Sequence, residues 1–437
     1  MSSSASPPSR SRLIDVRIEQ ARRVRGAPHV PGDKSISHRA LLFGALAAGR
    51  TEITGLLESE DVRATRGCLE AMGASVHADE ARLVVEGAGR LRNPGRTLDC
   101  MNSGTTMRLL MGVLAGARVN ATLDGDASLR RRPMRRVAGP LRQMGAHITL
   151  ADGDVAPVRI DDGAPLHGID YALPVASAQV KSSLLLAGAL AEGTTVLRGL
   201  IHSRDHTERM LPHFGVHLDA RRDEIVIEGG QPWHGARVVV PGDPSTAAFW
   251  IAAATIVPDS EVELQNILLN PTRIGFIDVL RRMGASIEAH VERTEPEPVG
   301  TLRVRSAQLR ATTITGDEIP AMIDEVPLVA VLATFAHGTT AIRGAEELRV
   351  KESDRIETVA QNLRAMGAQV ETLPDGFVIE GPQLLHGARI DTHGDHRVAM
   401  AFSIAALGAG GTTQIEGAEC ASVSYPKFYE TLAELTR

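Results

Sequence analysis

Carboxylates and basic side chains stand close together at one point in the second half of the sequence. Glu352 lies between Lys351 and Arg355, and Asp324 begins an apolar stretch shortly before them. A carboxylate can take up or release a proton, and lysine or arginine pairs with the phosphate or carboxylate groups of a ligand. Residues of these types predict a site for small anions with proton-transfer groups beside them.

The apolar stretch after Asp324 has five counterparts elsewhere in the chain. Each is an uninterrupted apolar run of about 12 residues, too short to cross a bilayer. Because the runs are apolar on all faces, we predict buried helices. Each run starts at a residue type that caps helices well, because its side-chain oxygen accepts free N–H groups of the first turn. The starts are Asp33, Asn102, Ser177, Asp243, Asp324 and Asp395.

A second sequence motif, which contains Met-Gly or Phe-Gly, recurs between these runs. It occupies residues 68–76, 141–148, 211–218, 280–287 and 363–370. Each copy predicts an amphipathic helix that ends at a C′ glycine and leads into a strand. The chain is therefore about six copies of one unit of about 70 residues, in the order strand, helix, strand, helix, strand, strand.

Two similar Pro-Gly turns divide these six units into two groups of three. Residues 30–33 and 240–243 both read Val-Pro-Gly-Asp, and Pro-Gly pairs mark changes of chain direction. We predict one domain at 32–240 and a second that joins 13–31 to 241–437. The sixth unit stops before its closing strands, so a strand at residues 13–18 is expected to complete it. Residues 1–12, rich in Ser, Pro and Arg, are predicted to be a disordered tail.

The composition narrows the class of protein. A net charge of −6 gives no indication of nucleic-acid binding. The three cysteines lie far apart without metal-ligand spacing, which is typical of buried free thiols in a reducing compartment. There is no secretory signal, dinucleotide-binding glycine fingerprint or P-loop. We expect a cytoplasmic, monomeric enzyme that binds neither membranes nor nucleic acid, and that uses no metal or cofactor.

Polar residues gather where the buried helices begin. If the units pack alike, helix N-termini with free N–H groups form one anion-binding face per domain. Each residue also has an ordinary structural explanation: Asp324 could be only a cap, and the charged run at 349–355 could be a solvated helix start. Together the basic residues predict a cleft for a ligand with several negative charges: Lys34, Arg39, Arg132, Lys351, Arg355 and Arg397.

Seven ordered motifs resemble the EPSP synthase family of enolpyruvyl transferases over nearly the whole chain. They lie at residues 32–39, 102–106, 177–181, 203–207, 323–325, 349–355 and 395–397. The resemblance implies two similar inverted α/β domains, joined by a two-strand hinge. Each would contain three βαβαββ units with buried helices and outer sheets.

The resemblance also implies a reaction and residue roles. The substrates would be shikimate 3-phosphate and phosphoenolpyruvate, and the products 5-enolpyruvylshikimate 3-phosphate and phosphate. Asp324 and Glu352 would carry protons, and Lys34 would neutralise the leaving phosphate. Shikimate 3-phosphate would be held by Ser35, Arg39, Ser177, Ala178, Gln179, Ser203, Arg204 and Lys351. Phosphoenolpyruvate would be held by Lys34, Gly104, Arg132, Gln179, Arg355 and Arg397.

The chain departs from the best-known branch of this family at several positions. His206 replaces a tyrosine, Glu347 an asparagine and Leu109 a proline. Val423 replaces a lysine near the C-terminus, so we assign no contact there.

Two other functions remain open from the sequence. One is the sister transferase that acts on UDP-N-acetylglucosamine, which carries a cysteine on a loop of the second unit. The corresponding residues 124–136 contain arginines and no cysteine. The other is a non-catalytic anion-binding member of the fold, which the presence of Asp324, Glu352 and Lys34 together disfavours.

Overall fold

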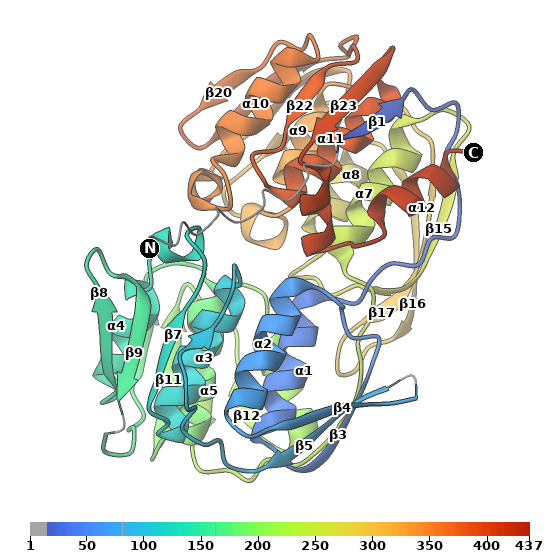
Figure 1. Ribbon diagram of the computed structural model, residues 1–437. Coiled ribbons are helices and arrows are strands. Elements are labelled where there is room, and N and C mark those ends of the chain that lie inside the picture. The colour runs from blue at the N-terminus through green and yellow to red at the C-terminus, as the bar shows by residue number, and fades with distance from the viewer. Residues whose placement is uncertain (1–14, 81, 162) are drawn as a thin grey trace, which may run out of the picture.

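The computed structural model describes residues 15–437, except residues 81 and 162. It shows two lobes, one above the other (Figure 1). The core of the first lobe is formed by buried residues between 36 and 240, with Leu268 added. The core of the second lobe joins Ile18, Val24 and Val30 to buried residues between 247 and 435. The predicted tail at 1–12 lies outside the described residues.

Three four-stranded sheets with one common order surround the helices of the first lobe. In each sheet the first two strands are parallel and the other two add antiparallel, which is the predicted βαβαββ pattern. In sheet order the strands are β14 (Arg237–Val239), β3 (Ala48–Thr54), β5 (Arg82–Ala88), β4 (Ser75–Asp79); β6 (Leu98–Asp99), β7 (Ala121–Asp124), β9 (Val155–Asp161), β8 (His147–Ala151); and β10 (Asp170–Leu173), β11 (Thr194–Gly199), β13 (Ile225–Glu228), β12 (Leu218–Ala220).

The second lobe repeats this order twice and then shortens it. Its complete sheets are β2 (Arg25–Gly26), β15 (Glu261–Leu268), β17 (Val299–Arg305), β16 (Ser286–Arg293); and β18 (Thr313–Ile314), β19 (Gly338–Ile342), β21 (Gly376–Gly381), β20 (Glu371–Leu373). The third sheet has three strands: β22 (Arg389–Asp391), β23 (Thr412–Glu416) and β1 (Val16–Glu19). β1 pairs antiparallel with β23, so the N-terminal segment does complete the sixth unit. The predicted strand began at residue 13, and residues 13 and 14 lie outside the described chain.

The six predicted buried helices are all present. They are α1 (Lys34–Leu46), α3 (Gly104–Ala117), α5 (Ala178–Leu190), α7 (Pro244–Ile256), α9 (Val326–Ala333) and α11 (His396–Gly408). Almost every residue along them is buried. Because each helix lies inside its lobe, only the polar groups at its ends can reach a ligand.

Two of the six predicted caps are wrong. The hydroxyl of Ser103, not Asn102, caps α3 by accepting the N–H of Thr106 at 3.1 Å. The amide of Asn102 is instead committed to Asp126 at 2.7 Å. The residue before α9 is Glu325, whose side chain makes no capping bond. Asp324 lies outside that helix, so its carboxylate is free to bind cations.

The recurring Met-Gly and Phe-Gly motifs end helices as predicted, with one exception. The regular copies are α2 (Glu60–Ala71), α4 (Arg135–Gln143), α8 (Gly275–Arg282) and α10 (Arg355–Ala365). In the copy at 211–218, α6 (His206–Met210) gives way to a 3-10 turn over Leu211–Phe214, where Pro212 lacks an N–H for regular helix bonding. Gly215 after it has φ 85°, and the other four terminal glycines are also in the left-handed region. A last helix, α12 (Phe428–Leu435), ends the chain.

The chain passes between the lobes at the two predicted Val-Pro-Gly-Asp segments, which pair with each other. The N–H of Asp33 donates to the carbonyl of Pro241 at 2.7 Å, and that of Asp243 to the carbonyl of Pro31 at 2.9 Å. A Cβ on Gly32 would lie 2.0 Å from the carbonyl oxygen of Gly55, so only glycine fits this crossing. The start of α1 and the start of α7 therefore emerge from one two-strand hinge.

Candidate active site

Arg355, at the start of α10, is the centre of a cluster of charged side chains at the predicted cleft. Its Nη2 lies 2.7 Å from Oε2 of Glu352, its Nε 2.8 Å from Oδ2 of Asp395, and its Nη1 3.5 Å from Oδ1 of Asp324. Burial would lower the pKa of this guanidinium, but the charges of Asp395 and Glu352 raise it above the usual value. One buried arginine thus orients both of the predicted proton-transfer carboxylates.

Asp324 is surrounded by cations from both lobes. Its Oδ2 accepts from Nη2 of Arg204 at 2.7 Å and lies 3.9 Å from Nη2 of Arg397. Burial alone would raise the pKa of Asp324, but these positive charges hold it well below its usual range. The carboxylate is therefore ionised at neutral pH.

Glu352 is also ionised in this arrangement. Burial raises its pKa, but the charges of Arg355, Arg132 and Lys34 lower it further than burial raises it. Arg132 reaches from the first lobe, with its Nη2 3.9 Å from Oε1 of Glu352. The pKa of Glu352 therefore depends on how strongly these cations remain paired with it.

Gly104, the first residue of α3, lies beside these arginines. A Cβ on Gly104 would lie 2.9 Å from Nη1 of Arg108 and 3.4 Å from Nη1 of Arg132. Arg132 Nη1 also donates to the backbone carbonyl of Asn102 at 3.4 Å. Arg108, which the family pattern did not assign, donates to Oε1 of Gln179 at 2.6 Å and so links the starts of α3 and α5.

Lys34, in the first turn of α1, faces the same cleft. Its Nζ lies 3.1 Å from Oδ2 of Asp61, and its charge contributes to the lowered pKa of Glu352. Nothing in the sequence distinguishes Asp61, because an acidic residue in the first turn of a helix is common for electrostatic reasons alone.

The residues predicted for shikimate 3-phosphate lie mainly around the start of α5. Ser177 caps that helix, and Ala178 and Gln179 form its first turn. The hydroxyl of Ser203 is buried and has no hydrogen-bond partner among the described residues. Lys351, across the cleft, has a lowered pKa because burial disfavours its charge more than Asp324 favours it. An anion from the substrate would supply the missing partner for such groups.

Arg39 is placed deeper than the other predicted ligands. It is 3% exposed and donates to Thr207, to Ser182 and to the backbone carbonyl of Ser35. Burial lowers its pKa to about 10. Arg39 therefore links Ser35, Ser182 and Thr207 within the first lobe.

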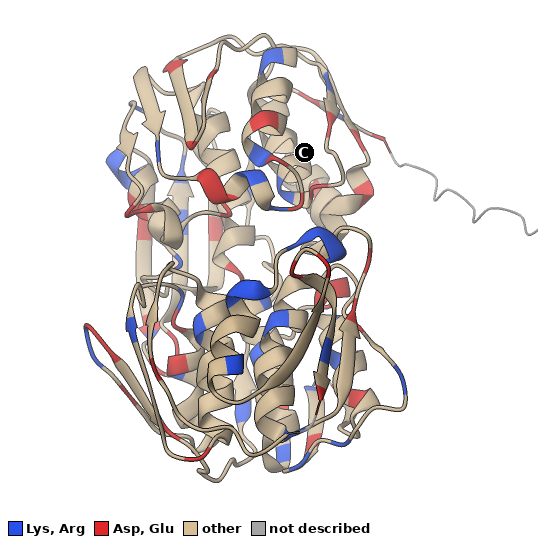
Figure 2. Cartoon of the chain, turned by 90° about the vertical axis from the view of Figure 1, so that its left-hand side faces the viewer, with Lys and Arg blue, Asp and Glu red and all other residues tan. Residues whose placement is uncertain are grey.

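Charged pairs cross the cleft between the lobes. Besides Arg204 with Asp324 and Arg132 with Glu352, Arg136 Nη1 lies 2.9 Å from Oε1 of Glu347. Figure 2 shows Lys and Arg gathered on both lobes where they face each other. The basic groups that were spread along the sequence therefore meet in one place.

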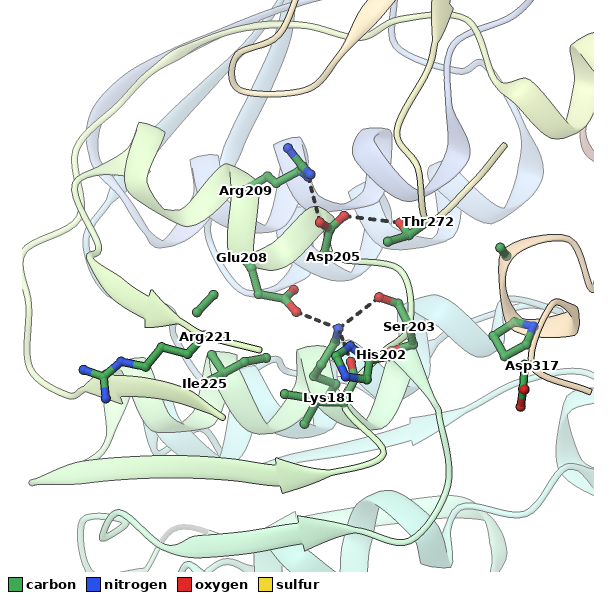
Figure 3. Close-up of a pocket in the computed structure, with 14 residues that line it drawn as sticks. Lys181, His202, Ser203, Asp205, Glu208, Arg209, Arg221, Ile225, Thr272 and Asp317 are labelled. Carbon is green, nitrogen blue, oxygen red and sulfur yellow. Dashed lines mark hydrogen bonds and ion pairs between the residues drawn. The ribbon is translucent and has the colours of Figure 1, made fainter. Parts of the chain in front are cut away.

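A separate cavity of about 470 Å³ lies behind Ser203, between the lobes (Figure 3). Its floor holds Lys181, whose Nζ lies 2.6 Å from Oε1 of Glu208 and 3.1 Å from the carbonyl oxygen of Ser203. Neither Asp324 nor Glu352 lines it. Lys181 thus supports the backbone at Ser203 from below instead of facing the charged cleft.

The chain matches known proteins along almost its full length. A family model described as EPSP synthase (3-phosphoshikimate 1-carboxyvinyltransferase) matches residues 18–432. The 3-phosphoshikimate 1-carboxyvinyltransferase of Synechococcus sp. (strain JA-3-3Ab) is 52% identical over 426 residues, covering 96% of each chain. That of Geobacillus thermodenitrificans is 49% identical over 418 residues, covering 94% of this chain and 96% of its own.

Solved structures agree with these matches. EPSP synthase from Acinetobacter baumannii is 40% identical, covers 97% of this chain and 98% of its own, and superposes with a TM-score of 0.87. The enolpyruvyl transferase NikO from Streptomyces tendae, at 20% identity and a TM-score of 0.77 over 96% of each chain, shares the fold. Sequence and structure give the same result: this chain belongs to the EPSP synthase family, the 3-phosphoshikimate 1-carboxyvinyltransferases, and is a transferase.

Proposed function

We propose that the cleft transfers the enolpyruvyl group of phosphoenolpyruvate to the 5-hydroxyl of shikimate 3-phosphate. The observation that carries this proposal is the pair of ionised carboxylates, Asp324 and Glu352, held by Arg355 between them. A non-catalytic anion-binding protein gains nothing from two partly buried carboxylates beside its anion. Arginines alone would bind the anion better, because each carboxylate repels it.

The two substrates divide the cleft between them. Phosphoenolpyruvate, with its phosphate and carboxylate, takes basic side chains of both lobes together with a glycine backbone and an amide at the starts of α3 and α5: Lys34, Gly104, Arg132, Gln179, Arg355 and Arg397. Shikimate 3-phosphate takes the hydroxyl and amide groups around the start of α5, together with basic groups of both lobes: Ser35, Arg39, Ser177, Ala178, Gln179, Ser203, Arg204 and Lys351. Binding between the lobes brings the hydroxyl near C2 of phosphoenolpyruvate, which makes the reaction effectively intramolecular.

The reaction proceeds by addition followed by elimination. In the addition, the 5-oxygen bonds to C2 of phosphoenolpyruvate, the hydroxyl proton passes to Asp324, and C3 takes a proton from Glu352 to become a methyl group. In the elimination, C3 returns a proton to Glu352, the double bond re-forms, the bond from C2 to the phosphate oxygen breaks, and the proton held by Asp324 leaves with the phosphate. Lys34 neutralises the departing phosphate. No other reactant is consumed.

The charges around Glu352 explain how a carboxylate with a lowered pKa can supply a proton. In this structure Arg355 and Arg132 hold it ionised. When the phosphate and carboxylate of phosphoenolpyruvate bind these guanidiniums, the guanidiniums pair less strongly with Glu352. A nearby anion also favours the neutral acid, so substrate binding raises the pKa of Glu352. Arg204, in contrast, keeps Asp324 ionised as the base.

The two lobes are proposed to be domains at 32–240 and at 13–31 with 241–437, which close over the substrates. A single chain supplies every proposed ligand from both sides of the cleft, so we propose a monomer. The two buried thiols, Cys68 and Cys100, support a reducing compartment, and we propose the cytoplasm. Within the described residues, no helix has the length and apolar character needed to span a membrane.

Phosphate release from phosphoenolpyruvate tests the function. The account requires release when shikimate 3-phosphate is added and none when UDP-N-acetylglucosamine is added instead. Release with the nucleotide sugar would select the sister reaction. Release with neither acceptor, from protein that binds phosphoenolpyruvate, would select the non-catalytic alternative.

A further inference from the structure

Arg273, a residue that no sequence motif indicated, is buried at the point where the chain crosses between the lobes. It lies in the loop between β15 and α8 and is 3% exposed. Its Nη1 lies 2.6 Å from Oδ2 of Asp33, and its Nη2 3.0 Å from Oδ1 of Asp243. One guanidinium therefore ties together the carboxylates of both hinge segments.

Each of these carboxylates also holds the start of a buried helix. Oδ1 of Asp33 accepts the N–H of Ile36 and caps α1, which begins with Lys34. Oδ1 of Asp243 accepts the N–H of Ser245 and caps α7. The other oxygen of Asp243 lies 3.2 Å from the backbone N of Lys34, across the hinge. The backbone position of Lys34 therefore depends on a carboxylate that Arg273 orients.

The same guanidinium reaches toward Arg397 through Ser245. Nη2 of Arg273 donates to the hydroxyl of Ser245 at 3.2 Å. The backbone carbonyl of Ser245 accepts from Nη1 of Arg397 at 3.4 Å. Lys34 and Arg397 come from opposite lobes, and both are proposed ligands of phosphoenolpyruvate. Arg273 is the group that connects their supports.

A third contact extends this cluster into the first lobe. Nη1 of Arg273 lies 3.1 Å from Nε2 of His206, and Nδ1 of His206 lies 2.7 Å from Oε1 of Glu297. Arginine can only donate, so Nε2 accepts and Nδ1 carries the hydrogen. This assigns a neutral imidazole, in agreement with the pKa of His206, which burial lowers well below its usual value. His206 therefore links Arg273 to Glu297 through the two nitrogens of its ring.

We propose that Arg273 is a positioning residue of the transfer reaction, which fixes Lys34 against Arg397 by clamping Asp33 and Asp243 at the hinge. The proposal rests on the proposed roles of Lys34 and Arg397 at phosphoenolpyruvate. The planar fork is essential because it serves two carboxylates at once, whereas a lysine ammonium is a single point charge on a flexible stem. Arg273→Lys preserves the charge and removes this geometry.

The test compares Arg273→Lys with Arg303→Lys. Arg303 is an exposed arginine on β17, away from the hinge, and pairs with Glu263 at 2.8 Å, so it is a matched control. Because a displacement of about 1 Å in a reactive group can cost about 10²-fold, we expect kcat/KM for phosphoenolpyruvate to fall by about 10²-fold in Arg273→Lys. The Kd of shikimate 3-phosphate for the free enzyme is expected to rise far less than kcat/KM falls, because only Ser35 and Arg39 of its proposed ligands lie on the clamped helix α1, whereas Ser177, Ala178 and Gln179 lie at the start of α5. The control should match the wild type in both quantities.

A second variant separates positioning from folding. Asp33→Asn keeps an oxygen that can cap α1 but replaces the charged partner of Arg273. All variants are assayed at a temperature where circular dichroism shows native helix content. If Arg273→Lys does not fold, Asp33→Asn alone decides. Its kcat/KM for phosphoenolpyruvate should fall by at least about tenfold while the Kd of shikimate 3-phosphate is retained, because it breaks only one arm of the clamp.

Unchanged kcat/KM in either folded variant overturns the proposal. Equal loss of affinity for both substrates also overturns it, since that result indicates general damage. These outcomes are read against the wild-type rate. A wild-type enzyme that releases no phosphate with shikimate 3-phosphate contradicts the proposed function itself, whatever the variants do.

Discussion

Arg204 from the first lobe and Asp324 from the second meet across the cleft, 2.7 Å apart. This pair joins the base proposed for the reaction to the wall of the opposite lobe. Of the charges that lower the pKa of Asp324, that of Arg204 is the strongest. The pKa of this carboxylate is therefore coupled to the contact between the two lobes.

The pH profile of Arg204→Ala tests this coupling. A carboxylate with a depressed pKa keeps its charge above that pKa and loses it as the pH falls through it. Without Arg204 the pKa of Asp324 rises, so the acidic limb of kcat/KM is expected to move to higher pH. Arg198→Ala, which removes an exposed arginine on β11, is the control. An acidic limb that stays in place would mean that Asp324 is not the group that must be ionised.

Glu352→Gln preserves the shape of the side chain and removes its ability to titrate. We expect kcat to fall by roughly 10²–10⁴-fold, the usual contribution of a general acid or base. The Kd values of both substrates, measured by calorimetry, should change little. Glu288→Gln on exposed β16 serves as the control. Near-normal turnover of Glu352→Gln would show that Glu352 only pairs with Arg355.

Arg397→Ala is expected to act on phosphoenolpyruvate. Loss of a charged hydrogen bond should weaken binding in the presence of shikimate 3-phosphate by about 1.5–3 kcal/mol. Arg397 is 5% exposed and its Nη1 lies 3.7 Å from Glu325, so thermal unfolding is measured in parallel to detect a loss of stability. An unchanged affinity for phosphoenolpyruvate would remove Arg397 from the site.

Gly104→Ala should affect glyphosate binding more than phosphoenolpyruvate binding. Glyphosate is the inhibitor expected from the family resemblance, and it is slightly longer than phosphoenolpyruvate. The added methyl group would lie 2.9 Å from Arg108 Nη1, so that guanidinium must shift, and it would touch Arg132 Nη1 at 3.4 Å. The longer ligand has less room to follow that shift. We expect the inhibition constant of glyphosate to rise far more than the KM of phosphoenolpyruvate. Equal proportional changes in the two constants would show that Gly104 does not discriminate.

Local patterns were enough to predict the repeated units and most of the cleft. Capping chemistry located Asp33, Ser177, Asp243 and Asp395, because an N-cap is decided by residues next to it in sequence. At the start of α3 two adjacent residues, Asn102 and Ser103, could both act as caps. Only the structure shows that Asn102 is used elsewhere and that Ser103 makes the bond.

The long-range contacts that support the site could not be predicted in this way. Arg273 binds Asp33 from 240 positions away, and Arg204 binds Asp324 from 120 positions away. A charged residue in a loop is normally solvated, so nothing in the neighbourhood of Arg273 distinguished it from an ordinary surface arginine. Such contacts depend on how the lobes pack, which the six local patterns do not determine.

Deuterium incorporation during turnover tests the account most directly. In the proposed addition, C3 of phosphoenolpyruvate gains a proton that Glu352 has exchanged with solvent, and the resulting methyl group then loses any one of its three hydrogens. In deuterium oxide the account therefore predicts deuterium on the vinyl carbon of 5-enolpyruvylshikimate 3-phosphate, detected by NMR or mass spectrometry. Formation of that product with no vinyl deuterium would contradict transfer by proton addition and elimination at these carboxylates.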